Sequence, residues 1–459
     1  MSQTKPIRFN AFAMHSPVHQ SPGLWRHPDD QSLAYNTLAY WVDLAKTLER
    51  GLVDALFIAD SLEFNDVHGG NSDAALRHAA QVPKNDPIVS ISAMAYATRH
   101  LGFGVTSNAN NEPPYAFARR MSTLDHLTGG RIGWNIVTGY ARSSARALGN
   151  ARVIAHDERY DIADEYMEVV YKLWEGSWQD GAVVRDRQSG VFAAPDKVRR
   201  VVHQGRYFST EGIHLTEPSP QRTPLLFQAG SSSRGKAFAG KHAECVYLSG
   251  PSTTVLAPVV ASTRAEAVRA GRRAQDILFF AMATIITGRT DAEAREKLSD
   301  YEQYISTDAA LTVFSGWTGI DFSTLDPDEP IRHLTIENGI RSALENFTTG
   351  DPDRVWTVRE LARHNAIGGR GPVFVGSPAT VVDQLEKWVA ATDIDGFNLS
   401  YAITPKAYED FADLIVPELQ RRGRYKHAYE AGTLREKLFA GAGSLLPERH
   451  PAARYRQLA

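Results

Sequence analysis

A turn rich in glycine and serine, from Gln228 to Gly235, has the composition of an anion-binding site. It follows an apolar segment and opens an amphipathic one, so we expect it to begin a helix. The first backbone N–H groups of a helix have no partner within it, and the helix dipole places positive charge there. Ser231 and Ser232 would add hydroxyl donors, and Arg234 a positive charge. A serine in this position is also an ordinary helix cap, and the turn alone favours neither interpretation.

Two further groups of polar side chains have positions typical of ligand contacts. His156 and Tyr160 are four residues apart, so they share one face at the start of a predicted helix. Asp60 ends one apolar strand, and Thr106 lies near the end of another. In isolation, a charged first turn is the simpler interpretation of the first pair. A capping role explains Asp60 nearly as well as a ligand contact.

The sequence lacks the motifs of several other chemistries. It has no HExxH motif, no GxSxG nucleophile elbow, no Walker loop and no GxGxxG turn after a strand. The single cysteine, Cys245, falls within a predicted strand and is interpreted as a small core residue. The histidines are scattered, so we expect no metal site. We also expect no dedicated dinucleotide-binding domain.

The composition of the 459-residue chain is that of an ordinary globular enzyme, with 43% hydrophobic and 22% charged residues. The net charge of -3 argues against a general nucleic-acid or anionic-membrane surface, which needs a clustered basic face. No apolar run is long enough to span a bilayer, and the first residues do not resemble a secretion signal. We therefore expect a cytoplasmic protein.

Short apolar strands alternate with amphipathic helices along the chain, which predicts a parallel sheet closed into a (β/α)8 TIM barrel, an α/β fold, in one domain over residues 1–459. The working groups of such a barrel lie at the carboxyl ends of its strands, which here are Asp60, Thr106 to Asn108, Asn135 to Thr138, Gly230 to Ser231 and Tyr401. The predicted strands are Arg8–Met14, Asp54–Asp60, Leu101–Ser107, Arg131–Thr138, Thr223–Ala229, Glu244–Leu248, Leu278–Thr287 and Gly396–Tyr401. The predicted helices are Tyr35–Arg50, Ile88–His100, Pro113–Leu127, Glu158–Trp174, Ser232–His242, Asp291–Ile305 and Ser377–Ala391.

Two long stretches interrupt this alternation, at about residues 178–222 and 306–371. The first is polar and rich in glycine and proline, and the second is irregular. Both are too long for ordinary barrel loops, so we interpret them as insertions. The tail, about residues 432–459, has no pattern that places it.

Longer strings of residues give the chain a family resemblance over about residues 8 to 440. It resembles the luciferase-like superfamily, in the branch of nitrilotriacetate, pristinamycin-synthase and dibenzothiophene-sulfone monooxygenases. The string from Ser122 to Thr138 is the most specific. Within the branch, Gly316 to Phe322 and Leu325 to Pro330 look most like the dimethyl sulfide monooxygenases. The other matching segments are Trp25–His27, Leu48–Gly51, Phe57–Asp60, Ala118–Met121, His156–Tyr160, Gly190–Phe192, Ser219–Arg222 and Gln228–Ser231.

The resemblance implies that FMN binds at the carboxyl mouth of the barrel. Tyr160, Ser231 and Ser232 would then hold its phosphate, and His156 would fix the phosphate end or the ribityl chain. The ring system would face Asp60 and Thr106. One departure concerns the position after Thr138: several relatives have a serine there, whereas this chain has Gly139-Tyr140, which puts a substrate role for that serine in doubt.

The activity implied is that of the oxygenase component of a two-component flavin monooxygenase. A separate NAD(P)H:flavin reductase would supply reduced FMN, and O₂ would oxidise a small organic substrate, with C–S or C–N bond cleavage. Such chemistry needs a closed, largely apolar site, and both insertions are expected to act as lids. A homodimer or homotetramer is expected. The alternatives are a deazaflavin-dependent reductase, oxidative cleavage of a heterocycle such as riboflavin, and a non-catalytic flavin-binding protein.

Overall fold

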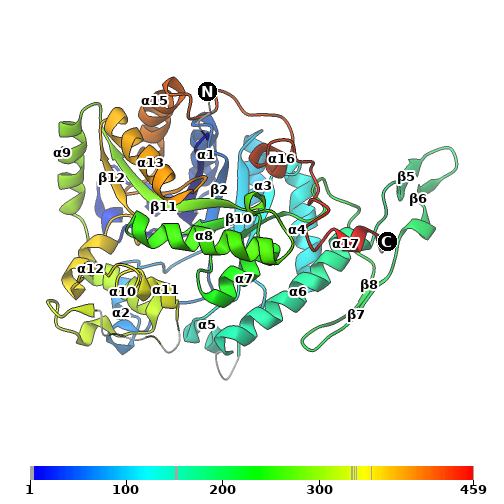
Figure 1. Cartoon of the computed structure of the whole chain (residues 1–459), viewed down its shortest axis with the longest axis horizontal. Helices are drawn as coiled ribbons and strands as arrows, with labels where there is room; N and C mark the ends of the chain where they lie inside the picture. Colours follow the sequence, from blue (N-terminus) through cyan, green and yellow to red (C-terminus); the bar gives the residue numbers. More distant parts are fainter. Residues whose placement is uncertain are drawn as a thin grey trace.

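The computed structural model describes residues 5–149, 154–331, 334, 336, 339–352 and 354–457. Eight parallel strands close into a barrel, because β1 pairs with both β2 and β13 and β11 pairs with both β10 and β13. The predicted TIM barrel is therefore confirmed (Figure 1). Its strands, in their order around the barrel, are β1 (Arg8–Met14), β2 (Ala55–Ala59), β3 (Gly102–Asn108), β4 (Ile132–Val137), β9 (Leu225–Gln228), β10 (Cys245–Leu248), β11 (Leu278–Thr287) and β13 (Gly396–Ser400).

Helices surround the barrel and pack their apolar faces against the outer side of the strands. They are α1 (Leu38–Arg50), α3 (Ile88–Ala97), α4 (Pro114–Thr128), α6 (His156–Gly176), α7 (Ser233–His242), α8 (Thr253–Arg269), α9 (Asp291–Glu302) and α13 (Pro378–Thr392). After β13 the chain runs through α14 (Lys406–Asp410), a π-helical turn (Phe411–Ile415) and α15 (Val416–Arg421). The shorter helices are α2 (Asp73–Arg77), α5 (Arg142–Ala147) and α17 (Arg454–Gln457).

One strand and one helix beside the barrel are among the elements that were not predicted. Strand β12 (Val373–Gly376) is a short edge strand that pairs only with the last residues of β11. Helix α8 contains Pro258, which removes a backbone donor and reads in a sequence as a helix breaker. Both owe their formation to packing that local sequence does not reveal, since α8 lies against α7 and α13.

The interior of the barrel is filled by aromatic and aliphatic side chains, including Phe57, Phe227 and Tyr247. The amino end of the barrel is closed by α16 (Leu434–Leu438), whose Leu434 and Leu438 are fully buried against these side chains. The tail that the sequence left unplaced therefore contributes to the core. The carboxyl end of the barrel stays open to the loops, which is where the site is found.

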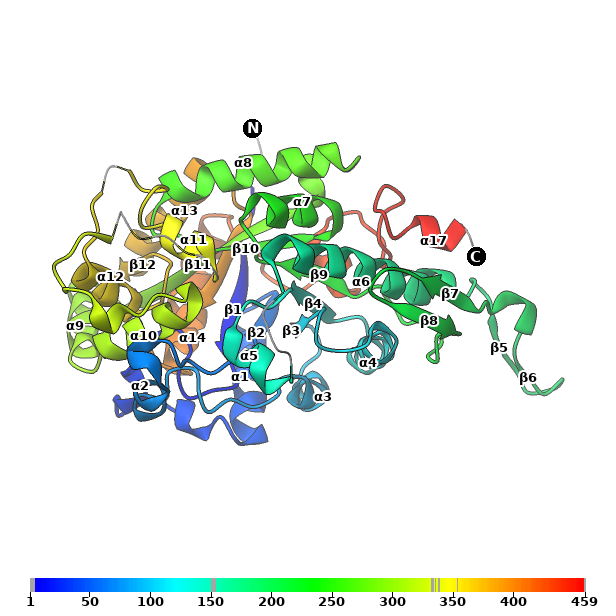
Figure 2. The same cartoon turned by 90° about the horizontal axis from the view of Figure 1, so that it is seen from below.

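The first insertion forms an arm that projects from the barrel (Figures 1 and 2). It contains two antiparallel hairpins, β5 (Val183–Asp186) with β6 (Val191–Ala193), and β7 (Val201–Gln204) with β8 (Ser209–Gly212). Its tip is exposed, and none of its described residues lines the cavity at the carboxyl end. The expectation that this insertion acts as a lid was therefore wrong.

The second insertion is helical rather than irregular. It contains α10 (Thr307–Thr318), α11 (Arg341–Glu345) and α12 (Val358–Asn365), which form a separate apolar core together with α2. Phe314, Phe347 and Trp356 lie at the centre of this core in edge-to-face contacts.

Within the described part of the chain, no helix is long and apolar enough to cross a membrane.

Candidate functional site

A cavity of about 510 Å³ lies at the carboxyl end of the barrel. Its wall is formed by the ends of β1, β2, β3, β4, β9 and β10, the starts of α6 and α7, and the second insertion. All six residues singled out from the sequence line this one cavity: Asp60, Thr106, His156, Tyr160, Ser231 and Ser232. Tyr401, also at a predicted strand end, is buried elsewhere and does not line it.

The starts of α6 and α7 meet in a tight polar cradle. Ser232 caps α7, because its hydroxyl accepts a hydrogen bond from the backbone N–H of Gly235 at 3.1 Å. The same hydroxyl lies 3.3 Å from Nε2 of His156. A Cβ atom on Gly230 would lie 2.6 Å from the Tyr160 hydroxyl, and one on Gly235 would lie 2.8 Å from it. A side chain at either position would displace the Tyr160 hydroxyl, so the two glycines let this hydroxyl lie close to the turn that opens α7.

A cation that was not singled out from the sequence also reaches this part of the cavity. Arg159 lines the cavity and is 7% exposed, and its Nη1 donates to the carbonyl of Ile154 at 3.2 Å. Its Nε has no hydrogen-bond partner among the described residues, and burial lowers the pKa of its guanidinium. Arg234, by contrast, donates to Asp161 and Asp164 on α6 and is not among the lining residues. Of these two arginines, Arg159 therefore lines the cavity and Arg234 does not.

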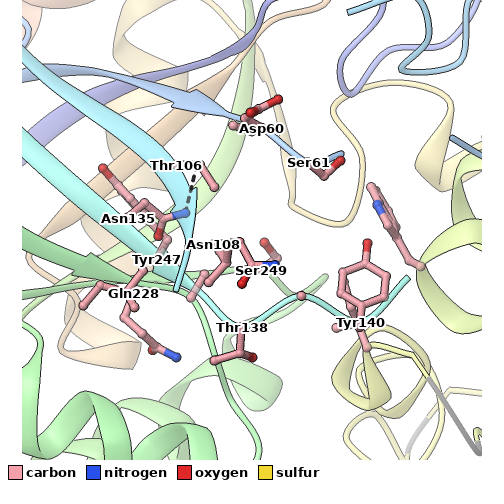
Figure 3. Close-up of a pocket in the computed structure, with 18 of the residues that line it drawn as sticks. Asp60, Ser61, Thr106, Asn108, Asn135, Thr138, Tyr140, Gln228, Tyr247 and Ser249 are labelled. Atoms are coloured by element: carbon pink, nitrogen blue, oxygen red, sulfur yellow. Dashed lines mark hydrogen bonds between the residues drawn. The ribbon is translucent and has the colours of Figure 1, made fainter. Parts of the chain in front are cut away.

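Unpaired amide oxygens face the barrel interior from several strands. The Thr106 hydroxyl donates to the carbonyl of Ile58 at 3.0 Å, and Asn135 donates its amide N–H to Thr106 at 3.0 Å (Figure 3). The side-chain oxygens of Asn135, Gln228 and Asn398 are buried without a partner among the described residues. Because buried polar atoms are nearly always hydrogen-bonded, these oxygens are placed to accept a hydrogen bond from a ligand or a water molecule in the cavity.

A stack of flat aromatic side chains lies beside these amides. The rings of Phe12 and Phe57 are 4.8 Å apart and nearly parallel, and those of Phe57 and Tyr247 are 4.2 Å apart. All three side chains line the cavity. They offer an apolar surface suited to a planar ring system.

The chain that follows β2 brings a group of ionisable residues to the cavity. Burial raises the pKa of Asp60 to about 6, while Lys84 opposes the shift. Burial also raises the pKa of Glu63, whose carboxylate accepts a hydrogen bond from the Tyr140 hydroxyl at 3.0 Å. Lys84 donates to the Ser61 hydroxyl at 2.8 Å. Perturbed carboxyl groups in a cavity are typical of functional sites.

The departure at Gly139-Tyr140 has a structural reason. Gly139 has φ near +67°, and a Cβ atom there would lie 2.4 Å from the amide nitrogen of Asn108. This backbone conformation favours glycine and carries Tyr140 into the cavity wall, where Figure 3 shows it across the pocket from Gln228 and Tyr247. Tyr140 therefore lines the cavity, whereas in the sequence this stretch was notable only because a serine found in several relatives is missing.

Comparisons with known proteins agree with this geometry. The family model of the luciferase-like monooxygenases matches residues 14–424. The dimethyl-sulfide monooxygenase of Hyphomicrobium sulfonivorans is 49% identical over 452 residues, which cover 98% of this chain and 94% of that protein. The long-chain alkane monooxygenase of Geobacillus thermodenitrificans (strain NG80-2) is 45% identical, and the match covers 99% of each chain.

Solved structures show the same architecture. A crystal structure from Hyphomicrobium sulfonivorans, at 49% identity, superposes with a TM-score of 0.92 and covers 98% of this chain and 96% of its own. A riboflavin lyase, solved with modified FMN and its substrate riboflavin, is 38% identical and superposes with a TM-score of 0.91. That match covers 98% of this chain and 100% of the lyase.

Proposed function

This chain belongs to the luciferase-like monooxygenase family, and on that premise we propose that it is the oxygenase component of a two-component, FMN-dependent monooxygenase. A separate NAD(P)H:flavin reductase supplies reduced FMN, and O₂ oxidises a small organic substrate with cleavage of a C–S or C–N bond. The observation that carries the proposal is a single cavity that joins an anion cradle, unpaired amides and an aromatic stack at the carboxyl end of the barrel.

The residues present fit FMN part by part. The phosphate is held by Tyr160, Ser231 and Ser232 at the start of α7, with Arg159 contributing charge. His156 lies beside Ser232 and holds the phosphate end or the ribityl chain. Bound flavin supplies the electrons that activate O₂.

The ring system occupies the space between the aromatic stack and the strand ends. Asp60 and Thr106 face it, and the free oxygens of Asn135 and Gln228 accept from its polar edge. Trp317 and Ile340 of the second insertion cover the same cavity, which supports a lid role for residues 306–371. Keeping water out protects reduced flavin chemistry from unproductive side reactions.

Cleavage of riboflavin or a related heterocycle is the second candidate. It is favoured by the superposition on the riboflavin lyase, which matches this chain over nearly its whole length. Riboflavin therefore belongs in any substrate test, both as a substrate beside bound FMN and as a competitor for the FMN site.

A reconstituted assay tests the proposal. The protein is supplied with FMN, NADH and a generic flavin reductase, and a panel of sulfides, amines, alkanes and riboflavin is scored for product that incorporates oxygen from ¹⁸O₂. We expect labelled, substrate-dependent product only when the reductase is present. NADH oxidation by the pure chain alone would contradict the two-component assignment, and tight FMN binding with no product from any substrate would favour a non-catalytic flavin-binding protein.

Self-association into a dimer or tetramer is proposed as well. The arm carries apolar side chains that are more than a third exposed, among them Val184, Val191, Phe192 and Val202. Exposed apolar surface gathered on one projecting element is typical of a protein contact. Light scattering of the purified protein measures the oligomeric state directly.

A further inference from the structure

An arginine that forms no ion pair with any described residue lies on the side of the cavity formed by the second insertion. Arg370 lines the cavity between α12 and β12, and its guanidinium carbon is 4.7 Å from the centre of the Trp317 ring. Trp317, on α10, is 7% exposed and lines the same cavity. Stacking on an indole uses the flat face of a guanidinium and leaves its N–H edge available for hydrogen bonds.

That edge is not paired within the part of the chain that the structure describes. Nε of Arg370 is buried without a hydrogen-bond partner there, and burial lowers the pKa of the group to about 10. Tyr140 is an ionisable neighbour that acts on the pKa of Arg370, and the Tyr140 hydroxyl already donates to Glu63. A buried charge without a counter-charge is costly, so such groups are retained where a ligand supplies the opposite charge.

The carboxylates nearby are already balanced by another cation. Lys84 favours the ionised form of both Asp60 and Glu63, and burial still raises the pKa of both carboxyls. Neither carboxylate forms an ion pair with Arg370 among the described residues. The positive charge of Arg370 is therefore left for a group that enters the cavity.

The Arg370 side is distinct from the anion cradle assigned to the phosphate. The cradle lies at the starts of α6 and α7, next to the end of β9. Tyr140, the neighbour of Arg370, lies across the pocket from Gln228 at the end of β9 (Figure 3). Arg370 thus lies apart from the cradle, and an FMN phosphate bound in the cradle leaves Arg370 without an anion.

We propose that Arg370, whose guanidinium lies over the Trp317 ring, binds the carboxylate or sulfonate of the organic substrate, so that this enzyme acts on a small organic anion rather than on a neutral sulfide or hydrocarbon. The inference rests on the proposed function, since it places substrate beside flavin in one cavity. A planar guanidinium suits such oxyanions because it donates two parallel hydrogen bonds.

Binding calorimetry on the FMN-loaded protein tests this inference without requiring turnover. Three acids are each compared with the matching primary amide: 3-(methylthio)propanoate, 2-(methylthio)ethanesulfonate and N-methylglycine. We expect at least one acid to bind about ten-fold or more tightly than its amide, the effect of a charge-assisted hydrogen bond. Arg370→Met should bring that ratio to within about two-fold and leave the FMN dissociation constant unchanged.

A matched control separates charge in the cavity from charge in general. Arg354 also stacks on a tryptophan of the second insertion, Trp356, at 3.5 Å, but does not line the cavity. Arg354→Met should therefore keep the acid preference. Equal binding of all acids and amides by the native protein would overturn the inference, as would an Arg370→Met variant that loses FMN affinity instead.

Failure of the proposed function gives a different result. If the protein prefers the acids but forms no oxygenated product with reductase, NADH and O₂, the monooxygenase proposal fails and the Arg370 site stands. If product forms from neutral substrates only, with no acid preference in calorimetry, the function stands and the Arg370 site is refuted.

Discussion

Single hydroxyl groups at the starts of α6 and α7 carry much of the proposed affinity for FMN. Ser232 has two duties, because its hydroxyl caps α7 and faces the cradle at the same time. Tyr160 has no capping duty, and its hydroxyl position is defined by the two glycines that pack against it. Substitutions at the two residues therefore separate binding from helix stability.

We expect Tyr160→Phe and Ser231→Ala each to raise the FMN dissociation constant about ten-fold or more, since a hydrogen bond to a charged group contributes about 1.5–3 kcal/mol. Riboflavin, which lacks the phosphate, should bind the native site poorly. Fluorescence titration measures both effects. Tyr166→Phe, on the same helix but away from the cavity, should bind FMN normally. Wild-type affinity in both cradle variants would place the phosphate elsewhere.

A comparison with a second serine cap separates the role of Ser232 in FMN binding from its role as a helix cap. Ser252 caps α8 in the same way and does not line the cavity. Loss of either cap should cost about 1 kcal/mol of stability, whereas only Ser232→Ala should also weaken FMN binding.

Asp60 makes the stability of the protein depend on pH. Burial raises its pKa from 3.8 to about 6, so the folded protein holds this proton more tightly than the unfolded chain does. The proton on Asp60 adds most to the free energy of unfolding at pH values below the pKa that this group has in the unfolded chain. This stabilisation is lost as pH rises through about 6, and the loss amounts to at most about 3 kcal/mol. Asp60→Asn should therefore stabilise the protein by about 1 kcal/mol more at pH 8 than at pH 5.

Urea unfolding at the two pH values checks this expectation. Asp43→Asn is the control, because the Asp43 side chain is exposed and pairs only loosely with Lys46. A stability difference that does not change with pH would mean that Asp60 titrates normally.

At the scale of elements, the two insertions have separate tasks. The second insertion lines the cavity through Trp317, Ile340 and Arg370, and its own apolar core holds it together. The first insertion builds an arm that leaves the barrel and exposes its hairpins to solvent.

Shortening the arm tests that separation. Replacing residues 184–192 by Asn-Gly leaves a two-residue turn between Val183 and Ala193, which are paired with each other in the hairpin. We expect FMN affinity to stay within about two-fold of the native value, because no side chain of the cavity is removed and only the surface ion pair of Arg185 with Glu217 is lost. A fall in oligomeric state, measured by light scattering, is expected if the arm mediates self-association. Loss of FMN affinity in a folded variant would show that the arm reaches the site.

At the scale of the whole molecule, the two ends of the barrel divide function from stability, as is usual for this fold. The carboxyl end holds the cavity, and the amino end is closed by α16. There Arg435, 1% exposed, donates to both carboxylate oxygens of Glu244, at 2.6 and 3.0 Å. This pair lies between α16 and the start of β10 and ties the tail to the barrel.

Arg435→Met should destabilise the protein by about 3–5 kcal/mol, because it leaves a buried carboxylate without its partner. The FMN dissociation constant of the folded variant should not change. Arg359 provides the comparison, since it also contacts both oxygens of a carboxylate, that of Asp328, but on the surface. Arg359→Met should cost less than about 1 kcal/mol in the same denaturation experiment. Equal losses for the two variants would refute a special role for the buried pair.

Local sequence determined the barrel and most of the cradle. Each strand is a short apolar run, a pattern that can be identified without knowing which strands will pair with it, and β1 and β11 begin and end where predicted. The cap at Ser232 and the helical spacing of His156 and Tyr160 are local features as well, and the structure places all three in one cavity.

Tertiary structure alone decided what depends on distant neighbours. The helices of residues 306–371 need an apolar core shared with α2, which is more than 200 residues earlier, and β12 needs β11 beside it. Only the structure identifies Arg159, Tyr140 and Arg370 as residues of the site, because burial and the lack of hydrogen-bond partners are properties of the assembled fold. The pKa of Asp60 has the same origin, since burial is its main cause and no spacing in the chain encodes which side chains will cover a carboxyl group.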